Sequence, residues 1–285
     1  LRAHPYAYQE VKTADKGDLA GFDKAFFGHI GHIVRNVTRS VLLSLTRGRL
    51  AGRVTSGPAG RYFQKLSWIS ASFAFMADIG MASLGAALKA KQKIAGRYAD
   101  ILAWMHIGSG VLYQFINQGK RKEDLPFLHF AMGYTMNRIQ KAFDGIFMNM
   151  KVPGLSWFFR TFVLAWSKLN NLGSTPLDKH TNAIVDTVIY NEEVRDRLTD
   201  GVYAPDNLED PIGSLEHAFR LVKQSDAIER KLRKAVKSKQ LPKEKGANLV
   251  KVALEKGVIS NEDVEVLKKS ETVRWDAIQV DHFPA

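Results

Sequence analysis

Few residues in this 285-residue chain have an obvious capacity for chemistry. His29 and His32 stand three positions apart, a spacing at which two imidazoles on one helix face can bind one metal ion. A metal site needs a further ligand, but no Asp or Glu occurs from residue 24 to residue 77, and Arg35 and Arg39 would repel a cation. We therefore predict that these histidines pack or form hydrogen bonds, and that the chain holds no metal site.

The other motifs that could carry chemistry are incomplete. Gly108-Ser-Gly110 lacks the third glycine and the preceding strand of a dinucleotide fingerprint, so helix packing explains it better. Asp178-Lys179-His180 are adjacent on an expected helix and point in different directions. The chain contains no P-loop, no Gly-x-Ser-x-Gly elbow and no cysteine, which excludes a thiolate nucleophile and disulfides. We predict no catalytic residue in this chain.

The aromatic segment at residues 152–166 is the part of the sequence that most strongly indicates a functional contact. It concentrates Trp157, Phe158, Phe159, Phe162 and Trp166 between Lys151 and Lys168, with Arg160 inside it. The segment is too short to span a bilayer, but tryptophans with basic flanks are typical of a segment lying among lipid headgroups. The alternative is a buried helix or a loop that contacts a partner. Both interpretations remain open from the sequence.

The positive charge is concentrated in the first half of the chain. The net charge is +12, and residues 1–150 hold 20 basic and 9 acidic residues, which is an excess of 11. Residues 24–77 contain eight basic residues and no acid. Such a segment favours an anionic partner, such as a membrane surface or an acidic protein face, although it is also compatible with ordinary solvated charge. The chain lacks a nucleic-acid recognition motif, so we predict no nucleic-acid partner.

Hydrophobic spacing indicates helices throughout, and few segments alternate with period two. We expect an all-α fold, a helical bundle over residues 1–200 followed by a smaller helical subdomain over residues 201–285. The irregular stretch 201–211 is the predicted border. Helices are expected at 22–46, 61–88, 94–119, 124–150, 176–198, 213–239, 243–256 and 261–276, with an extended tail from residue 278. Ser260 and Asp263 predict a capping box.

Two of these helices predict specific faces. In the helix that begins at Arg61, one set of positions recurs at helical spacing: Leu66, Ile69, Phe73, Met76, Ala77, Gly80 and Leu84. Small residues along this helix would allow another helix to approach closely. In the helix over 22–46, apolar residues gather near one face: Phe26, Ile30, Ile33, Val37, Val41 and Leu45. No run of about 18 uncharged apolar residues occurs, so we expect no simple membrane-spanning helix.

The order of short motifs resembles the C-terminal part of the large bacterial acyl-CoA dehydrogenases. The matching pieces extend over nearly the whole chain, and their shared order makes the resemblance specific. They are His4-Pro5-Tyr6, Phe22-Asp23-Lys24, His29-Ile-Gly-His32, Leu45-Thr-Arg-Gly48, Arg61-Tyr62, Ala77-Asp78, Leu84-Gly85, Leu88-Lys89, Arg97, Ala99-Asp100-Ile-Leu102, Asp124-Leu-Pro126, Pro176-Leu-Asp178-Lys179, Asp210-Pro-Ile-Gly213, Lys256-Gly-Val-Ile259 and Ile278-Gln-Val-Asp281-His-Phe283.

The resemblance implies a parent enzyme that carries FAD and oxidises an acyl-CoA to the trans-2-enoyl-CoA in fatty-acid β-oxidation. In the family, a glutamate followed by glycine, shortly before His-Pro-Tyr, removes the α-proton while the flavin takes a hydride. This chain has no Glu-Gly pair. The resemblance therefore implies that the catalytic base and the FAD-binding residues lie upstream of Leu1, and that this chain alone binds no FAD.

The expected partners follow from the same resemblance. They are the upstream catalytic domains of the same protein, a second copy in a homo-oligomer and, for the parent enzyme, acyl-CoA and an electron-transfer flavoprotein. We expect a cytoplasmic protein, with a peripheral position on an anionic inner membrane as a further expectation. The alternative is a stand-alone helical membrane-surface or adaptor protein without enzymatic activity.

Overall fold

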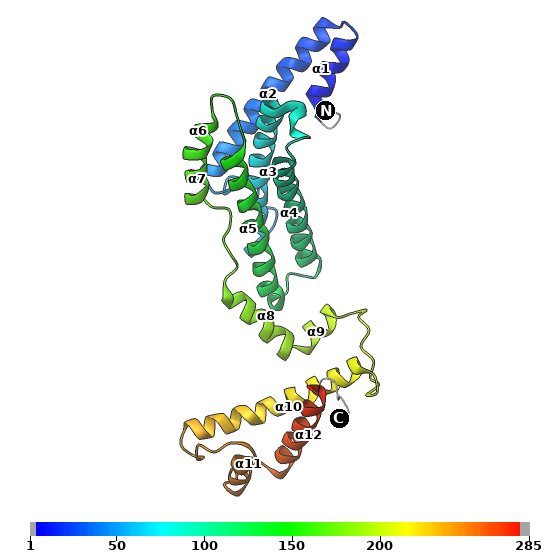
Figure 1. Ribbon diagram of the computed structural model, residues 1–285, viewed down its shortest axis with the longest axis vertical. Coiled ribbons are helices and arrows are strands. Elements are labelled where there is room, and N and C mark those ends of the chain that lie inside the picture. Colours follow the sequence, from blue (N-terminus) through cyan, green and yellow to red (C-terminus); the bar gives the residue numbers. More distant parts are fainter. Residues whose placement is uncertain (1–3, 280–285) are drawn as a thin grey trace, which may run out of the picture. The chain divides into compact units, whose positions relative to one another are not determined.

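The computed structural model describes residues 4–279, and these residues form helices and connecting turns without a strand (Figure 1). The prediction of an all-α fold is confirmed. The chain divides into two compact units, Leu1–Ile184 and Val185–Ala285. The predicted border at residues 201–211 lies inside the second unit, and a functional division there stays a prediction.

The first unit is built from five main helices that pack in chain order. α1 contacts α2, α2 contacts α3, α3 contacts α4, and α4 contacts α5 (Figure 1). Their bounds are α1 Pro5–Asp15, α2 Leu19–Leu45, α3 Gly57–Leu84, α4 Gln92–Asn117 and α5 Leu125–Asn149. Short 3₁₀ turns, η1 (Gly85–Leu88) and η2 (Lys122–Asp124), follow α3 and precede α5.

The core of this unit lies between α3, α4 and α5. Its fully buried side chains include Ile69, Ile101, Leu112, Met136, Ile139 and Ile146. The predicted inner face of α3 faces this core: Leu66, Ile69, Met76 and Gly80 are buried, and Phe73, Ala77 and Leu84 are half-buried. Gly80 allows the close approach expected of a small residue, because a Cβ there would lie 2.7 Å from the Tyr98 hydroxyl oxygen. That hydroxyl donates to the Met76 carbonyl at 2.6 Å, and burial raises the pKa of Tyr98.

The apolar face of α2 does not lie in the core. Four residues of the predicted face are exposed, Phe26, Ile30, Val41 and Leu45, and the other two, Ile33 and Val37, are half-buried. Phe27 and Val34 beside them are also exposed. The residues of α2 that are buried are instead Ala25, Ser40 and Leu43. The sequence pattern correctly indicated an apolar helix face, but the structure covers another face, so α2 presents an apolar stripe outward within this unit.

α3 is also the helix that most resembles a membrane span. By length and composition alone, Gly57–Leu88 is long and apolar enough to cross a bilayer, and an 18-residue window within it has a mean hydropathy of 1.5. Core helices of soluble proteins pass the same test but are mostly buried, whereas 17% of this window is buried. It lies between α2 and α4, and its Asp78 accepts a hydrogen bond from Asn36 Nδ2 at 2.9 Å. These contacts suit a central bundle helix with a polar partner for its one carboxylate.

The aromatic segment folds back onto α5. It forms α6 (Ser156–Phe158), a five-residue π-helical turn η3 (Phe159–Val163) and α7 (Leu164–Leu169). A polar network joins α5 to α7, because Ser167 Oγ donates to Asp144 Oδ1 at 2.7 Å and Gln140 Nε2 donates to Ser167 Oγ at 2.6 Å. Gln140 Oε1 also accepts from the Leu172 backbone N–H at 2.8 Å, which fixes the chain after α7.

The second unit has its own small core. α8 (Asp178–Tyr190) contains the border between the units, and α9 (Glu192–Leu198), α10 (Pro211–Lys237), α11 (Gly246–Glu255) and α12 (Asn261–Ala277) follow. α10 packs against α12 around a cluster of apolar side chains: Leu232, Ala235, Leu241, Ala253, Val258 and Ile259. The predicted capping box of Ser260 and Asp263 is confirmed.

The prediction of one helix over residues 176–198 is wrong. The helix is interrupted at Asn191, whose side chain accepts a hydrogen bond from the Val194 backbone N–H at 3.1 Å and so starts α9. Asparagine favours such caps because its side chain competes for backbone donors. Most of the predicted extended tail, residues 280–285, lies outside the described residues.

Candidate functional site

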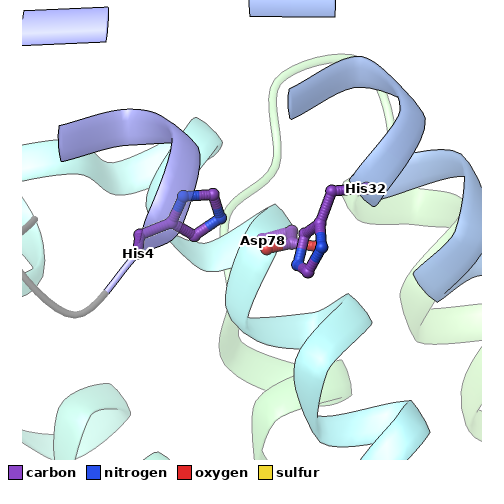
Figure 2. A group of neighbouring side chains, drawn as sticks. All are labelled: His4, His32 and Asp78. Carbon is purple, nitrogen blue, oxygen red and sulfur yellow. The ribbon is translucent and has the colours of Figure 1, made fainter. Parts of the chain in front are cut away.

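The histidines singled out in the sequence belong to a larger polar cluster where α1, α2 and α3 meet. His4 stands at the start of α1, His29 and His32 lie on α2, and Asp78 lies on α3. Figure 2 shows His4, His32 and Asp78 projecting from these three helices into one space. Each of these three side chains offers one potential metal-ligand atom, and these atoms all lie within 4.8 Å of one another. The tertiary fold therefore supplies the carboxylate that the local sequence lacks.

The cluster is tied together by specific contacts. His29 Nδ1 lies 2.8 Å from Glu10 Oε1, which joins α1 to α2. The His4 and His29 rings lie 4.5 Å apart between centroids, and the Tyr6 ring stacks at 13° to His29. Asp78 is oriented by its hydrogen bond from Asn36. The arrangement anchors α1 against α2 through rings and charges rather than through a large apolar surface.

The protonation of His4 decides whether this cluster suits a metal ion. His4 Nδ1 accepts a hydrogen bond from the Ala7 backbone N–H at 3.0 Å and thereby caps α1. In a neutral imidazole the proton then resides on Nε2, which becomes a donor and not a metal ligand. His4 Nε2 is buried without a hydrogen-bond partner within residues 4–279. A metal at this atom would require moving the proton to Nδ1 and losing the cap.

The local electrostatics favour neutral imidazole at this position. Burial lowers the pKa of His4, and the neighbouring His29 and His32 lower it further, against the opposing effects of Asp78 and Glu10. His4 already uses its Nδ1 to cap α1. The side chains of the cluster are therefore better suited to joining the helices than to binding a cation. The absence of a bound metal in this chain stays a prediction.

The structure divides the predicted aromatic contact residues into two groups. Phe159 is only 4% exposed and its ring stacks on Phe147 at 6.4 Å between centroids. The other four are largely exposed within the first unit, Trp157 at 67%, Phe162 at 57%, Phe158 at 45% and Trp166 at 44%. Burial therefore accounts for Phe159, whereas a membrane or partner contact of the four exposed residues stays a prediction.

The segment that carries the exposed aromatic side chains is held in place by polar and ring contacts. Trp166 Nε1 donates to Ser44 Oγ at 2.8 Å, and Asn170 Nδ2 donates to the Ser44 carbonyl at 2.7 Å, which fastens α7 to the end of α2. Arg160 Nε donates to the Met148 carbonyl at 3.1 Å. Trp157 lies edge-on to Phe162 at 5.4 Å. We call Trp157, Phe158, Phe162 and Trp166 the aromatic patch.

Two remaining sequence candidates have structural explanations. Gly108 is buried in α4, where a Cβ would lie 3.0 Å from Thr135 Cγ2, which confirms a role in helix packing. His180 of the Asp178-Lys179-His180 triplet lies 5.2 Å from the His129 ring, and His129 Nδ1 lies 2.9 Å from the Tyr62 hydroxyl. Burial lowers the pKa of His129, and His180 and Lys179 lower it further.

Sequence reasoning missed the roles of His4, Glu10 and Asp78. They are far apart along the chain, and no local spacing connects them with His29 and His32. The only available signal was the solitary Asp78 within an apolar helix, since a buried carboxylate needs a polar partner.

One comparison with known families identifies the chain. The model of the family described as acyl-CoA dehydrogenase, C-terminal, bacterial type, matches residues 1–283. The match extends through both compact units. No solved structure matches the chain significantly.

Proposed function

Because the chain belongs to the family of bacterial-type acyl-CoA dehydrogenase C-terminal domains, we propose that it is the non-catalytic helical part of an FAD-dependent enzyme that oxidises acyl-CoA to trans-2-enoyl-CoA in fatty-acid β-oxidation. The family match over 283 residues carries the proposal. In this proposal FAD and the base belong to the upstream part of the protein. The family's electron acceptor would be an electron-transfer flavoprotein.

Within residues 4–279, neither the hollows on α3 nor the carboxylates of the polar cluster fit a flavin site or a free catalytic base. The hollows on α3 are lined mainly by arginines, hydroxyls and aliphatic side chains, unlike the slot of precisely placed polar groups that a flavin ring needs. Glu10 is paired with His29, and Asp78 accepts from Asn36. The outward apolar stripe of α2, from Phe26 to Leu45, supports a docking role. Exposed apolar side chains that lie next to one another often mark a contact with another surface. We propose that this stripe of α2 contacts the upstream catalytic part of the same protein.

The test compares the full gene product with the 285-residue chain. We expect the full protein to contain flavin and to reduce an artificial electron acceptor when acyl-CoA is added. The chain alone should be colourless and inactive in the same assay. Flavin bound to the chain alone would contradict the proposal. A flavin-free full product would favour the alternative of a helical adaptor without enzymatic activity.

A second function, contact with an anionic membrane surface, rests on the aromatic patch. Its four side chains are exposed, and Lys151, Arg160 and Lys168 around it are exposed as well. Aromatic rings with cationic neighbours partition into the headgroup region, where the rings leave water and the charges meet anionic lipid. This contact would place the protein peripherally on the inner membrane from the cytoplasmic side.

Vesicle co-sedimentation tests the membrane contact. The double variant Trp157→Ser/Phe162→Ser should bind vesicles containing anionic phospholipid at least about tenfold more weakly, because two apolar rings no longer leave water. Its melting temperature should stay close to that of the wild type. Tyr113→Ser is the matched control, since Tyr113 is an equally exposed aromatic residue on α4. Equal vesicle binding by the wild type and the double variant would rule out this role.

A further inference from the structure

A groove runs over α3 between α2 and α4, apart from the polar cluster and from the aromatic patch. Its first hollow, of about 530 Å³, is lined by Arg35, Thr38, Arg39 and Leu42 of α2, the turn at Leu50 and Ser67 of α3. A second hollow, of about 390 Å³, shares Arg39 and Ser67 and continues between α3 and α4 along Phe63, Leu66, Leu102 and Met105. We call the two hollows together the α3 groove.

The two arginines of the groove lack protein partners. Arg35 and Arg39 lie one helical turn apart on α2, and within residues 4–279 neither guanidinium has an ion pair or a hydrogen bond. Surface arginines are common, but two that face one hollow without a carboxylate offer paired donors for an anion. Ser67 lines the same hollow and adds a hydroxyl donor, whereas the Thr38 hydroxyl donates to the Val34 carbonyl at 2.8 Å.

The surroundings increase the positive potential of this hollow. The turn that closes it carries Arg47 and Arg49, and Gln64 Nε2 donates to the Ala51 carbonyl at 3.1 Å and so holds that turn on α3. Burial lowers the pKa of Lys65, and Arg61 and Arg47 lower it further because like charges oppose its protonation. No acidic residue interrupts residues 24–77.

The second hollow has a different character. Its walls combine apolar side chains, Phe63 and Leu66 from α3 and Leu102 and Met105 from α4, with polar residues at Ser70, His106 and Ser109. Both hollows have volumes in the range of small-molecule sites, roughly 300–1,000 Å³. A positively charged hollow that continues into a partly apolar one matches a molecule with an anionic head and a hydrocarbon tail. A second copy of this chain is a poor match, because it would bring the same excess of positive charge to the groove.

We propose that the α3 groove binds a long-chain fatty carboxylate. The carboxylate accepts from Arg35 and Arg39, and the hydrocarbon tail lies in the second hollow between α3 and α4. This site lies outside the proposed catalytic part and goes beyond the proposed function, since it gives this domain a ligand of its own.

The test is equilibrium binding of palmitate and laurate, below their micellar concentrations, to the full 285-residue chain. Palmitate should bind several-fold more tightly than laurate, because a longer tail leaves more water. Arg39→Gln should weaken palmitate binding at least about tenfold, whereas Arg39→Lys should retain part of it. Lys89→Gln is the control, since it removes one charge from an exposed turn outside the groove. Circular dichroism and the melting temperature confirm that each variant folds.

Several results would overturn the proposal. Palmitate binding that is equally strong in Arg39→Gln and Lys89→Gln would show that only the net charge matters. Equal binding of inorganic phosphate and palmitate would mean that no tail site exists. Binding to anionic vesicles but not to monomeric palmitate would identify the groove as a lipid-headgroup contact. Concentration-dependent dimerisation that disappears in Arg39→Gln would identify it as a protein interface.

Discussion

Phe159→Ala is expected to destabilise the first unit by about 3–5 kcal/mol, whereas Phe158→Ala should cost less than about 1 kcal/mol. The two phenylalanines are neighbours in the chain, but Phe159 is 4% exposed and packs on Phe147, while Phe158 is 45% exposed. Truncating the buried ring leaves a cavity next to α5, and truncating the exposed ring removes little packing. Urea unfolding followed by far-ultraviolet circular dichroism measures both changes.

The variants Phe158→Ala and Phe159→Ala also distinguish an effect on protein stability from an effect on vesicle binding. Phe158→Ala should retain the fold and weaken vesicle binding, and Phe159→Ala should lower stability while the patch residues themselves are unchanged. If both variants unfold at the same urea concentration as the wild type, Phe159 does not pack on α5 as the structure shows. If Phe158→Ala is as destabilising as Phe159→Ala, the patch is buried in the protein as it exists in solution, and the membrane proposal loses its basis.

Gly60→Ala is expected to destabilise the first unit by at least about 2 kcal/mol, because the added methyl group meets backbone atoms. A Cβ at Gly60 would lie 1.9 Å from the Thr55 carbonyl oxygen and 3.0 Å from the Thr55 carbonyl carbon. Neither atom belongs to a flexible side chain, so the start of α3 or the preceding loop must shift. Thermal unfolding should show a melting temperature lowered by several degrees.

Gly96→Ala provides the matched control for Gly60→Ala. Gly96 is exposed inside α4, and a Cβ there would have no neighbour within 4 Å. Alanine is a better helix former than glycine by about 1 kcal/mol, so this variant should be slightly more stable than the wild type. A Gly60→Ala protein that melts with or above Gly96→Ala would show that the loop at Thr55 is not packed against α3.

Some features could be predicted from local sequence because local physics decides them. The Ser260 and Asp263 capping box is an exchange of hydrogen bonds over three residues, so its residue types suffice. The inner face of α3 follows from helical spacing. Asn191 shows the limit of this reasoning, because the choice between continuing a helix and capping a new one depends on small free-energy differences.

The sequence by itself determined the all-helical fold, the family and the concentration of positive charge in residues 24–77. Only the tertiary structure decided which apolar faces are covered and which distant polar groups meet. Helical periodicity reveals that α2 has an apolar face, but the direction of that face depends on where α3 packs. The same holds for Asp78 among the histidines and for Phe159 beneath the aromatic patch. These contacts join residues far apart in the chain, and their free energy depends on the whole packed arrangement and not on any local pattern.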